Sequence, residues 1–329
     1  MTRLPQGLLP FLDQAGWGGA IIHPIPGDAS FRRYFRVRTN GRRAMVMYAP
    51  PPEEDVVPFI VATEYLTAHS MRAPTIHARD AAQGWLLIED FGDSRMRDWL
   101  DENPQGEDGA YRAAIDTLVS LHTKPPGPFA AYDAEAYGRE VALFTEWYCP
   151  AMEIEVDEAA FFDAWSEVLK PLDKRRRSDV TVLRDYHAEN IMLLNPVPDG
   201  SGPQGLIDFQ DALVGHPAYD LVSLLQDARR DVSTDLERRM LRHYIERADP
   251  GLDFKADYAR LGAQRNAKII GIFTRLYRRD GKPQYLDYLP RVWAVLERDL
   301  AHPALEPVSR WFDVNIPREL RDDLGGRPA

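Results

Sequence analysis

Two aspartates and an asparagine in the second half of the chain have the residue types and spacing of a phosphoryl-transfer site. Asp185 stands five residues before Asn190, and Asp208 follows eighteen residues after Asn190. Phosphoryl transfer needs a carboxylate that orients the attacking hydroxyl and accepts its proton, and oxygen ligands that hold Mg²⁺ on the phosphates. We therefore predict Asp185 as the catalytic base and Asn190 and Asp208 as magnesium ligands. Taken singly, Asp and Asn often only shape turns, so the prediction depends on the joint pattern.

Short apolar runs beside these residues predict the strands that position them. Two apolar residues follow Asn190, and two more precede Asp208. We expect a β-rich island at 180–194 and 206–209, in which a tight loop directs Asp185 and Asn190 into one cleft. The second aspartate would complete the metal site where the chain leaves its strand.

The rest of the chain predicts a sheet followed by helices. We expect a helix at 4–15, strands at 20–26, 31–38, 42–48, 74–79 and 85–90, and a further helix at 53–71. In the second strand, Phe31, Phe35 and Val37 should share one face. Helical patterns dominate after residue 98, at 109–122, 135–148, 157–173, 216–229, 234–248, 255–277 and 285–300. The predicted fold class is α+β, with a small antiparallel sheet lobe at 1–90 and a larger, mostly helical lobe at 91–329.

Composition narrows the classes of partner. The 329 residues carry a formal net charge of −11, which argues against nucleic acid as the main partner. No apolar run approaches the roughly 20 residues that a membrane span needs, and the N-terminus does not resemble a signal peptide. Cys149 is the only cysteine, which excludes an intrachain disulfide and fits a reducing compartment. We expect a cytoplasmic protein without a membrane partner.

The segments around these residues resemble known enzymes. The runs 182–192 and 206–211 resemble the catalytic and metal loops of the aminoglycoside phosphotransferase family, whose members are related to protein kinases. Together, 27–37, 184–190 and 271–276 resemble the bacterial anomeric kinases of cell-wall sugar recycling. Those kinases phosphorylate the C1 hydroxyl of N-acetylmuramic acid and N-acetylglucosamine.

This resemblance implies a fold, two cofactors and a substrate. We expect a bilobal protein-kinase-like fold and a monomer that uses ATP and Mg²⁺ to phosphorylate N-acetylmuramic acid, N-acetylglucosamine or both in peptidoglycan recycling. Another small-molecule kinase of the family, acting on an aminoglycoside, choline or homoserine, is the alternative. A nucleotide-binding pseudokinase is a third reading, against which the intact set of Asp185, Asn190 and Asp208 argues.

Two departures from the family pattern affect the catalytic and ATP sites. Leu183 stands where many members carry a loop-shaping His. Met47 lies on the strand where protein kinases place the Lys that pairs with the phosphates, and no Lys precedes Lys124. We expect Arg32 or Arg33 to supply that charge instead.

Two further segments are predicted to bind ATP, because of their resemblance to the family and their position in the chain. The turn at 27–30, with Gly27 and Ser30, is a plausible loop over the phosphates, although a glycine in a hairpin is usually only a turn. The strand exit at Glu89, Asp90 and Phe91 is interpreted as the hinge between the lobes, where backbone groups would meet the adenine edge.

Candidate substrate contacts follow from charge and position. Arg265, Lys268 and Arg275 lie within about 80° of one another on a helical wheel and could meet a substrate carboxylate or phosphate. A solvated face with ion pairs is the competing interpretation. His187 could contact the substrate or hydrogen-bond within the loop, and Asp220 resembles a residue that supports the catalytic loop.

Overall fold

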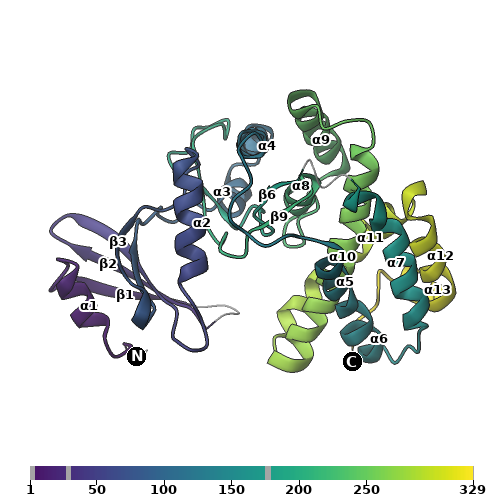
Figure 1. Ribbon diagram of the computed structural model, residues 1–329, viewed down its shortest axis with the longest axis horizontal. Coiled ribbons are helices and arrows are strands. Elements are labelled where there is room, and N and C mark those ends of the chain that lie inside the picture. Colours follow the sequence, from purple (N-terminus) through teal and green to yellow (C-terminus); the bar gives the residue numbers. More distant parts are fainter. Residues whose placement is uncertain (1–3, 27–30, 175–178, 329) are drawn as a thin grey trace. The chain divides into compact units, whose positions relative to one another are not determined.

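The computed structural model describes residues 4–26, 31–174 and 179–328 (Figure 1). The chain divides into two compact units. The sheet unit consists of Met1–Ala113 and Glu189–Ala212, and the helical unit consists of Ala114–Ala188 and Leu213–Ala329. Each unit is therefore discontinuous in sequence, and the lobe boundary at residue 90 stays a prediction.

An antiparallel sheet of five strands forms the centre of the sheet unit. The strands lie in the order β1-β2-β3-β5-β4. Their bounds are Ile21–Ile25 for β1, Arg33–Thr39 for β2, Arg42–Tyr48 for β3, Ile76–Asp80 for β4 and Trp85–Ile88 for β5. β5 is buried at every position because it lies between β3 and β4. The α+β class predicted from the sequence is confirmed.

One face of this sheet packs on the first helix, α1 (Leu8–Gln14). The buried apolar residues that form this core are Leu8, Phe11, Leu12, Trp17, Phe35, Val37, Ala44, Val46, Trp85 and Leu87. The expectation that Phe31 shares their face is wrong, because β2 begins only at Arg33 and the Phe31 side chain is 68% exposed. The predicted alternation of buried apolar residues therefore holds inside β2 but not before it.

The sheet unit also holds the hairpin that carries two of the predicted site residues. Strand β7 (Ile191–Leu193) pairs with β8 (Gln204–Leu206), directly after Asn190 and directly before Asp208 in sequence. Two helices, α2 (Val57–Ala68) and α3 (Met96–Glu102), belong to the same unit, and α4 (Glu107–His122) begins in it.

The helical unit contains one short strand pair and a group of helices. Strand β6 (Val180–Val182) pairs with β9 (Leu213–Gly215). The helices are α5 (Ala134–Leu143), α6 (Cys149–Ala151), α7 (Glu158–Asp173), α8 (Ala218–Leu225), α9 (Thr234–Ala248), α10 (Phe254–Asp280), α11 (Leu289–Leu300), α12 (Glu306–Asn315) and α13 (Arg318–Asp322). α10 is central, because it contacts α5, α8 and α11 (Figure 1). Within the described residues, no helix is both long and apolar enough to span a membrane.

A π-helical turn replaces the end of the helix predicted at 135–148. α5 ends at Leu143, and Phe144–Tyr148 form the π turn against α10. The two elements approach closely at Gly271, where an added Cβ would lie 2.3 Å from the backbone carbonyl of Leu143. Only a residue without a side chain fits there, so Gly271 fixes the distance between α10 and the end of α5.

We expect Gly271→Ala to lower the melting temperature measured by scanning calorimetry, because the methyl group would push against backbone that cannot swing aside. Overpacking of this kind costs about 1–3 kcal/mol. Gly138→Ala on α5 is the matched control, since an added Cβ there meets nothing within 4 Å. Ala is also favoured over Gly inside a helix, so the control should be neutral or slightly stabilising. Equal melting temperatures for the two variants would contradict this account of Gly271.

Candidate active site

The loop after β6 is held by one buried carboxylate. The Asp220 side chain accepts hydrogen bonds from the backbone N–H groups of Leu183, at 2.7 Å, and Arg184, at 2.8 Å. Arg184 has a φ of 69°, in the left-handed region that non-glycine residues rarely occupy. Burial raises the pKa of the Asp220 carboxyl to about 7, and the two N–H donors oppose that rise. The expectation that Asp220 supports this loop is confirmed.

This support presents the Asp185 side chain at the surface of the helical unit. The Asp185 side chain is 48% exposed, and its Oδ1 lies 3.6 Å from Nη2 of Arg265 on α10. Desolvation by itself would raise the pKa of the Asp185 carboxyl, but the nearby cations, Arg265 foremost, hold that pKa below its ordinary value. An exposed carboxylate that stays ionised at neutral pH can accept a proton from a bound hydroxyl.

A second carboxylate, Glu140 on α5, balances the cations beside Asp185. Glu140 pairs with Arg184 and accepts a hydrogen bond of 2.8 Å from Lys268 Nζ. Lys268 also donates to the hydroxyl of Tyr219 at 3.2 Å. Burial opposes ionisation of Glu140, yet Lys268 and Arg184 keep its pKa below the ordinary value. Two of the cations around Asp185 are therefore fixed by a half-buried anion.

The three predicted substrate contacts on α10 differ in their burial and in the hydrogen bonds and ion pairs that they make within the protein. Arg265 is buried and donates to Ser223 Oγ at 2.9 Å. Lys268 is engaged by Glu140, as described. Arg275 is half-buried, and among the described residues it has no hydrogen-bond or ion-pair partner, with its Nε buried. Arg265 and Lys268 thus organise the loop and its surroundings, while the substrate role of all three stays a prediction.

His187 is buried in the same loop. Its Nε2 lies 3.3 Å from Nη1 of Arg229, and the next backbone N–H, of Ala188, points to the Asp227 carboxylate at 3.3 Å. Desolvation is the main cause that lowers the pKa of the His187 imidazole. The His187 ring therefore contacts the segment after α8, and both a hydrogen bond of His187 within its own loop and its contact with a substrate stay predictions.

The two predicted metal ligands lie together in the sheet unit. Asn190 Nδ2 is 3.4 Å from Asp208 Oδ2, and the backbone N–H of Ile207 donates to the carbonyl of Asn190 at 3.1 Å. Asp208 has a φ of 59° and a side chain that is 47% exposed. Gln210, which the sequence analysis did not single out, donates to Asp208 Oδ1 at 3.0 Å.

Their donor set fits Mg²⁺. A carboxylate and an amide supply hard oxygen ligands, and Mg²⁺ usually takes its other ligands from phosphates and water. The amide of Asn190 must present its oxygen rather than its nitrogen to the ion, which requires only a flip of the side chain. Phe209, the next residue after Asp208, is buried and stacks on Phe59 of α2 at 5.2 Å, which anchors this short segment.

The structure distinguishes Arg32 from Arg33. The guanidinium of Arg32 lies 3.8 Å from Asp208 Oδ1 and 3.5 Å from Glu54. Arg33 instead lies over the ring of Phe35, 5.4 Å from its centroid. Of the two candidates, Arg32 is therefore the one beside the predicted magnesium site. Gly27 and Ser30, in the predicted phosphate loop, lie outside the described residues.

The predicted hinge residues use their side chains within the sheet unit. Glu89 receives a hydrogen bond of 2.8 Å from Arg72, which keeps the pKa of Glu89 low. Asp90 is buried against Arg36 at 2.8 Å. The ring of Phe91 lies under the Arg72 guanidinium, 4.7 Å from its centroid. Because these side chains contact arginines of the sheet unit, the backbone groups of this segment would have to make any contact with adenine. The hinge role stays a prediction.

Three comparisons relate the chain to known proteins. A sequence model of the "phosphotransferase enzyme family" matches residues 21–262. The chain is 35% identical to an N-acetylmuramate/N-acetylglucosamine kinase of Caulobacter vibrioides, over 94% of this chain and 96% of that protein. It is 36% identical to the protein of the same name in Pseudomonas aeruginosa, over 87% of this chain and 86% of that protein.

Solved structures with low sequence identity show the same fold. A putative aminoglycoside phosphotransferase from Ralstonia eutropha is 16% identical and superimposes with a TM-score of 0.64, over 93% of this chain and 98% of the other. The streptomycin–ATP ternary complex of APH(2″)-IIa is 15% identical, with a TM-score of 0.62 over 92% of this chain and 98% of the other. These likenesses confirm the predicted kinase-like fold.

We expect Asp220→Ala to free the backbone amides of Leu183 and Arg184, because both lose their acceptor. Each orphaned buried donor costs about 1–3 kcal/mol, so deuterium exchange of peptides covering this loop should become faster. Asp220→Asn keeps one acceptor oxygen and should give an intermediate rate. Asp231→Asn, at an aspartate whose side chain is 85% exposed, is the control. Unchanged exchange at the loop in Asp220→Ala would refute the supporting role of Asp220.

Proposed function

This chain belongs to the phosphotransferase enzyme family, and we propose that it transfers the γ-phosphoryl group of ATP to the anomeric hydroxyl of N-acetylmuramic acid or N-acetylglucosamine. The observation that carries the proposal is the 35% identity to a kinase named for these two sugars over nearly the full length of both chains. A third and a fourth bacterial protein with the same name, from Pseudomonas putida and Neisseria meningitidis, match at 36% and 32% identity. The chain is thus an ATP-dependent kinase, and the two sugars are its proposed acceptors.

Asp185 is proposed to act as the general base. Its ionised carboxylate accepts the proton of the attacking hydroxyl as the sugar oxygen bonds to the γ-phosphorus. The bond between that phosphorus and the β–γ bridging oxygen breaks, and ADP leaves with the electron pair. An anomeric hydroxyl is more acidic than the other hydroxyls of a sugar. A carboxylate whose pKa is lowered by Arg265 is a weak base, and it is better suited to an acidic hydroxyl than to an ordinary one.

Asn190 and Asp208 are proposed to hold Mg²⁺, which when bound neutralises charge on the phosphate oxygens. The role of the chain's own residues here is to fix the ligands. Phe209 anchors the segment through Phe59, and Gln210 orients the Asp208 carboxylate. Arg32 is proposed to contact the phosphates in place of the missing lysine, because it already lies beside Asp208.

Local charge favours these sugars over a cationic substrate. The loop of Asp185 and its contacts include as many cations as carboxylates: the cations are Arg184, Arg229, Arg265 and Lys268, and the carboxylates are Asp185, Glu140, Asp220 and Asp227. A cationic aminoglycoside or choline is best bound by an excess of carboxylates, which this part of the helical unit lacks. A neutral sugar, or one that carries a carboxylate, fits the balance better.

A panel of reducing amino sugars and one aminoglycoside, assayed for ADP release with ATP and Mg²⁺, tests the proposed function. We expect turnover of N-acetylmuramic acid or N-acetylglucosamine, with a product whose phosphorus NMR signal couples to the anomeric proton. Asp185→Asn should fold and bind nucleotide but lose about 10²–10⁴-fold in kcat, because the general base is gone. Asp231→Asn serves as the control for an acid-to-amide change.

Two results would overturn parts of this proposal separately. A phosphate on C3 or C6, or turnover of the aminoglycoside alone, would remove the anomeric assignment and leave a different kinase. Near-normal turnover by Asp185→Asn would remove the base assignment, whichever sugar is used.

We expect Arg32→Ala to raise the KM for ATP far more than the KM for the sugar, since the variant loses a cation beside the proposed metal site. Arg33→Ala removes the same charge from the adjacent residue and should change neither constant more than about twofold, because Arg33 contacts Phe35. Initial-rate kinetics with each substrate varied would distinguish them. An equal effect of both substitutions would indicate that overall charge, and not position, matters.

A further inference from the structure

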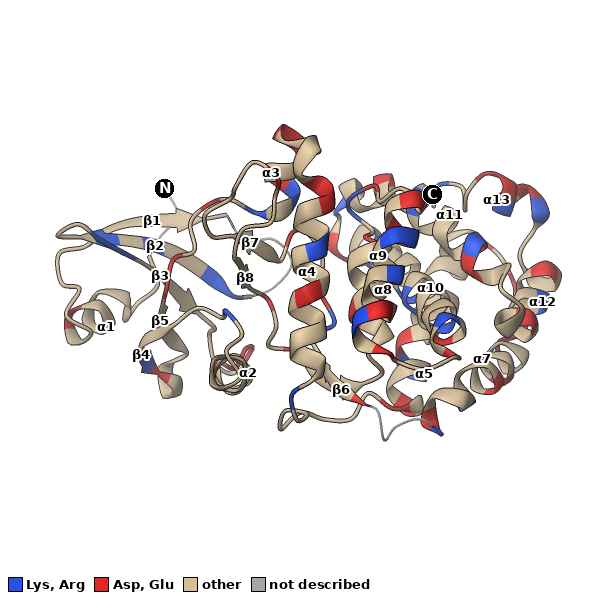
Figure 2. Ribbon diagram, turned by 90° about the horizontal axis from the view of Figure 1, so that it is seen from above, with Lys and Arg blue, Asp and Glu red and all other residues tan. Residues whose placement is uncertain are grey.

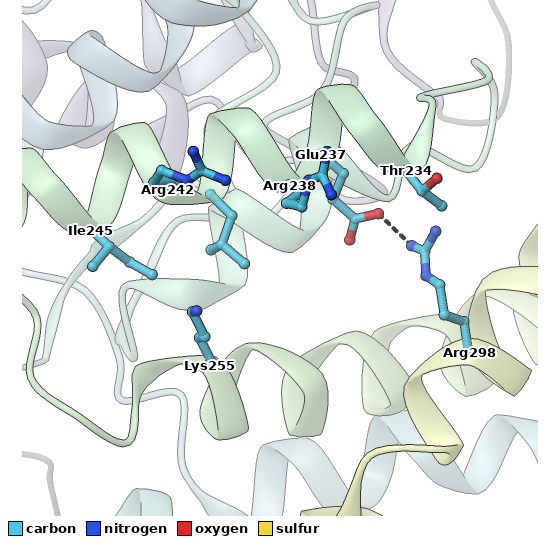
Figure 3. A pocket seen from close by; sticks show the side chains of 8 residues that line it. Thr234, Glu237, Arg238, Arg242, Ile245, Lys255 and Arg298 are labelled. Carbon is cyan, nitrogen blue, oxygen red and sulfur yellow. Dashed lines mark hydrogen bonds and ion pairs between the residues drawn. The ribbon is translucent and has the colours of Figure 1, made fainter.

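The helical unit has a cavity of about 470 Å³ that the proposed reaction does not use. It is bounded by α9, by the start of α10 and by the end of α11, and Figure 3 shows it from close by. Its volume lies in the range of small-molecule sites. Lys255, which lines it, precedes Arg265 by ten residues on α10, which separates them by about 15 Å along the helix axis. The cavity is therefore distinct from the surroundings of Asp185.

Four cations line this cavity in a protein of net charge −11. Arg238 and Arg242 come from α9, Lys255 from α10 and Arg298 from α11, so three separate helices bring positive charge to one place (Figure 3). Figure 2 shows Lys and Arg together with Asp and Glu on the helices of this unit. One carboxylate, Glu237, lies among the four.

Two of the four cations pair with carboxylates within the unit. Arg298 pairs with Glu237, whose other oxygen accepts a hydrogen bond from the Tyr258 hydroxyl at 2.8 Å. Arg238 pairs with Asp235 at 2.6 Å, and Asp235 also pairs with Arg239, so the charge of Arg238 is only partly compensated. Arg242 and Lys255 are exposed, and in the described parts of the chain neither has a hydrogen-bond or ion-pair partner. The cavity thus carries about two uncompensated positive charges.

Apolar side chains complete the lining. Leu241 and Ile245 are half-buried on α9, on the same helical face as Arg238 and Arg242. A ligand that fits must offer an anionic group to the cations and an apolar part to these two side chains. A phosphate monoester carries a charge of about −1.5 to −2 at neutral pH, which matches two free cations better than a single carboxylate does. Arg also binds phosphate through two parallel hydrogen bonds.

We propose that this cavity is a second ligand site of the protein, and that it binds a small phosphate monoester whose other part is apolar. Arg242 and Lys255 bind the phosphate, Leu241 and Ile245 contact the apolar part, and the Glu237–Arg298 pair holds one wall. The proposal does not depend on the sugar or on the reaction assigned to Asp185.

Phenyl phosphate is a suitable probe, and calorimetric titration against the full chain measures its binding. We expect saturable binding that weakens as salt is raised. Benzyl alcohol, which lacks the charge, and inorganic phosphate, which lacks the ring, should each bind more weakly. Arg242→Gln with Lys255→Gln should weaken binding of phenyl phosphate by at least about tenfold, since both charge-assisted contacts with the phosphate are lost.

The matched control is Arg310→Gln with Arg318→Gln. These two arginines are exposed on α12 and α13 and pair with Glu306 and Asp322, and their loss changes the net charge by the same amount. The control should bind phenyl phosphate like the wild type. Asp185→Asn should do so as well, which excludes binding at the proposed base.

Three results would overturn the second site. The first is no binding of phenyl phosphate to the wild type. The second is the same loss of affinity in both double variants, which would indicate an effect of net charge alone. The third is binding only to vesicles that contain phosphatidic acid, which would point to a lipid surface and not to a soluble ester.

Discussion

The contact between the Asp220 carboxylate and two successive backbone N–H groups determines most of what the helical unit offers for chemistry. Those hydrogen bonds offset the energetic cost of the left-handed backbone conformation of Arg184. Without that conformation the chain would continue as a strand, and the next side chain, Asp185, would follow the alternation of β6. A buried residue on α8 thus sets the direction of an exposed carboxylate 35 residues earlier in the chain.

The cations around Asp185 keep its carboxylate ionised while about half of the side chain stays exposed. Arg265 lies close enough to lower the pKa of Asp185, but at 3.6 Å and with Ser223 as its hydrogen-bond acceptor it leaves that carboxylate half-exposed. Lys268, one turn further along α10, is neutralised by Glu140. A nearer or freer cation would hold Asp185 in a closed salt bridge. The spacing of these charged groups therefore keeps Asp185 ionised and also leaves its carboxylate accessible to a substrate.

Local features could be predicted from the sequence, and distant contacts could not. The types and spacing of Asp185, Asn190 and Asp208, with apolar strands beside them, indicated both the chemistry and the β island. Glu140 was missed because its partners Arg184 and Lys268 are far away in sequence, and one sequence holds no signal that joins them. The choice between Arg32 and Arg33 needed the contact of Arg32 with Asp208, which is far away in sequence. The prediction for Phe31 was wrong because β2 begins only at Arg33, so the alternation does not extend to residue 31.

Discontinuity of the two units has a consequence for how the chain is made. The sheet unit takes its last hairpin from Glu189–Ala212, after Ala114–Ala188 have already contributed to the helical unit. On the ribosome, the nascent chain therefore cannot complete its first unit before the opening segment of the second has emerged. A fragment cut after residue 113 would lack the β7–β8 hairpin, whose Leu193 and Leu206 N–H groups donate to the carbonyls of Ser94 and Arg72. Neither unit can be produced alone by truncation, and a circular permutation or a designed linker across the excised segment would be needed to separate them.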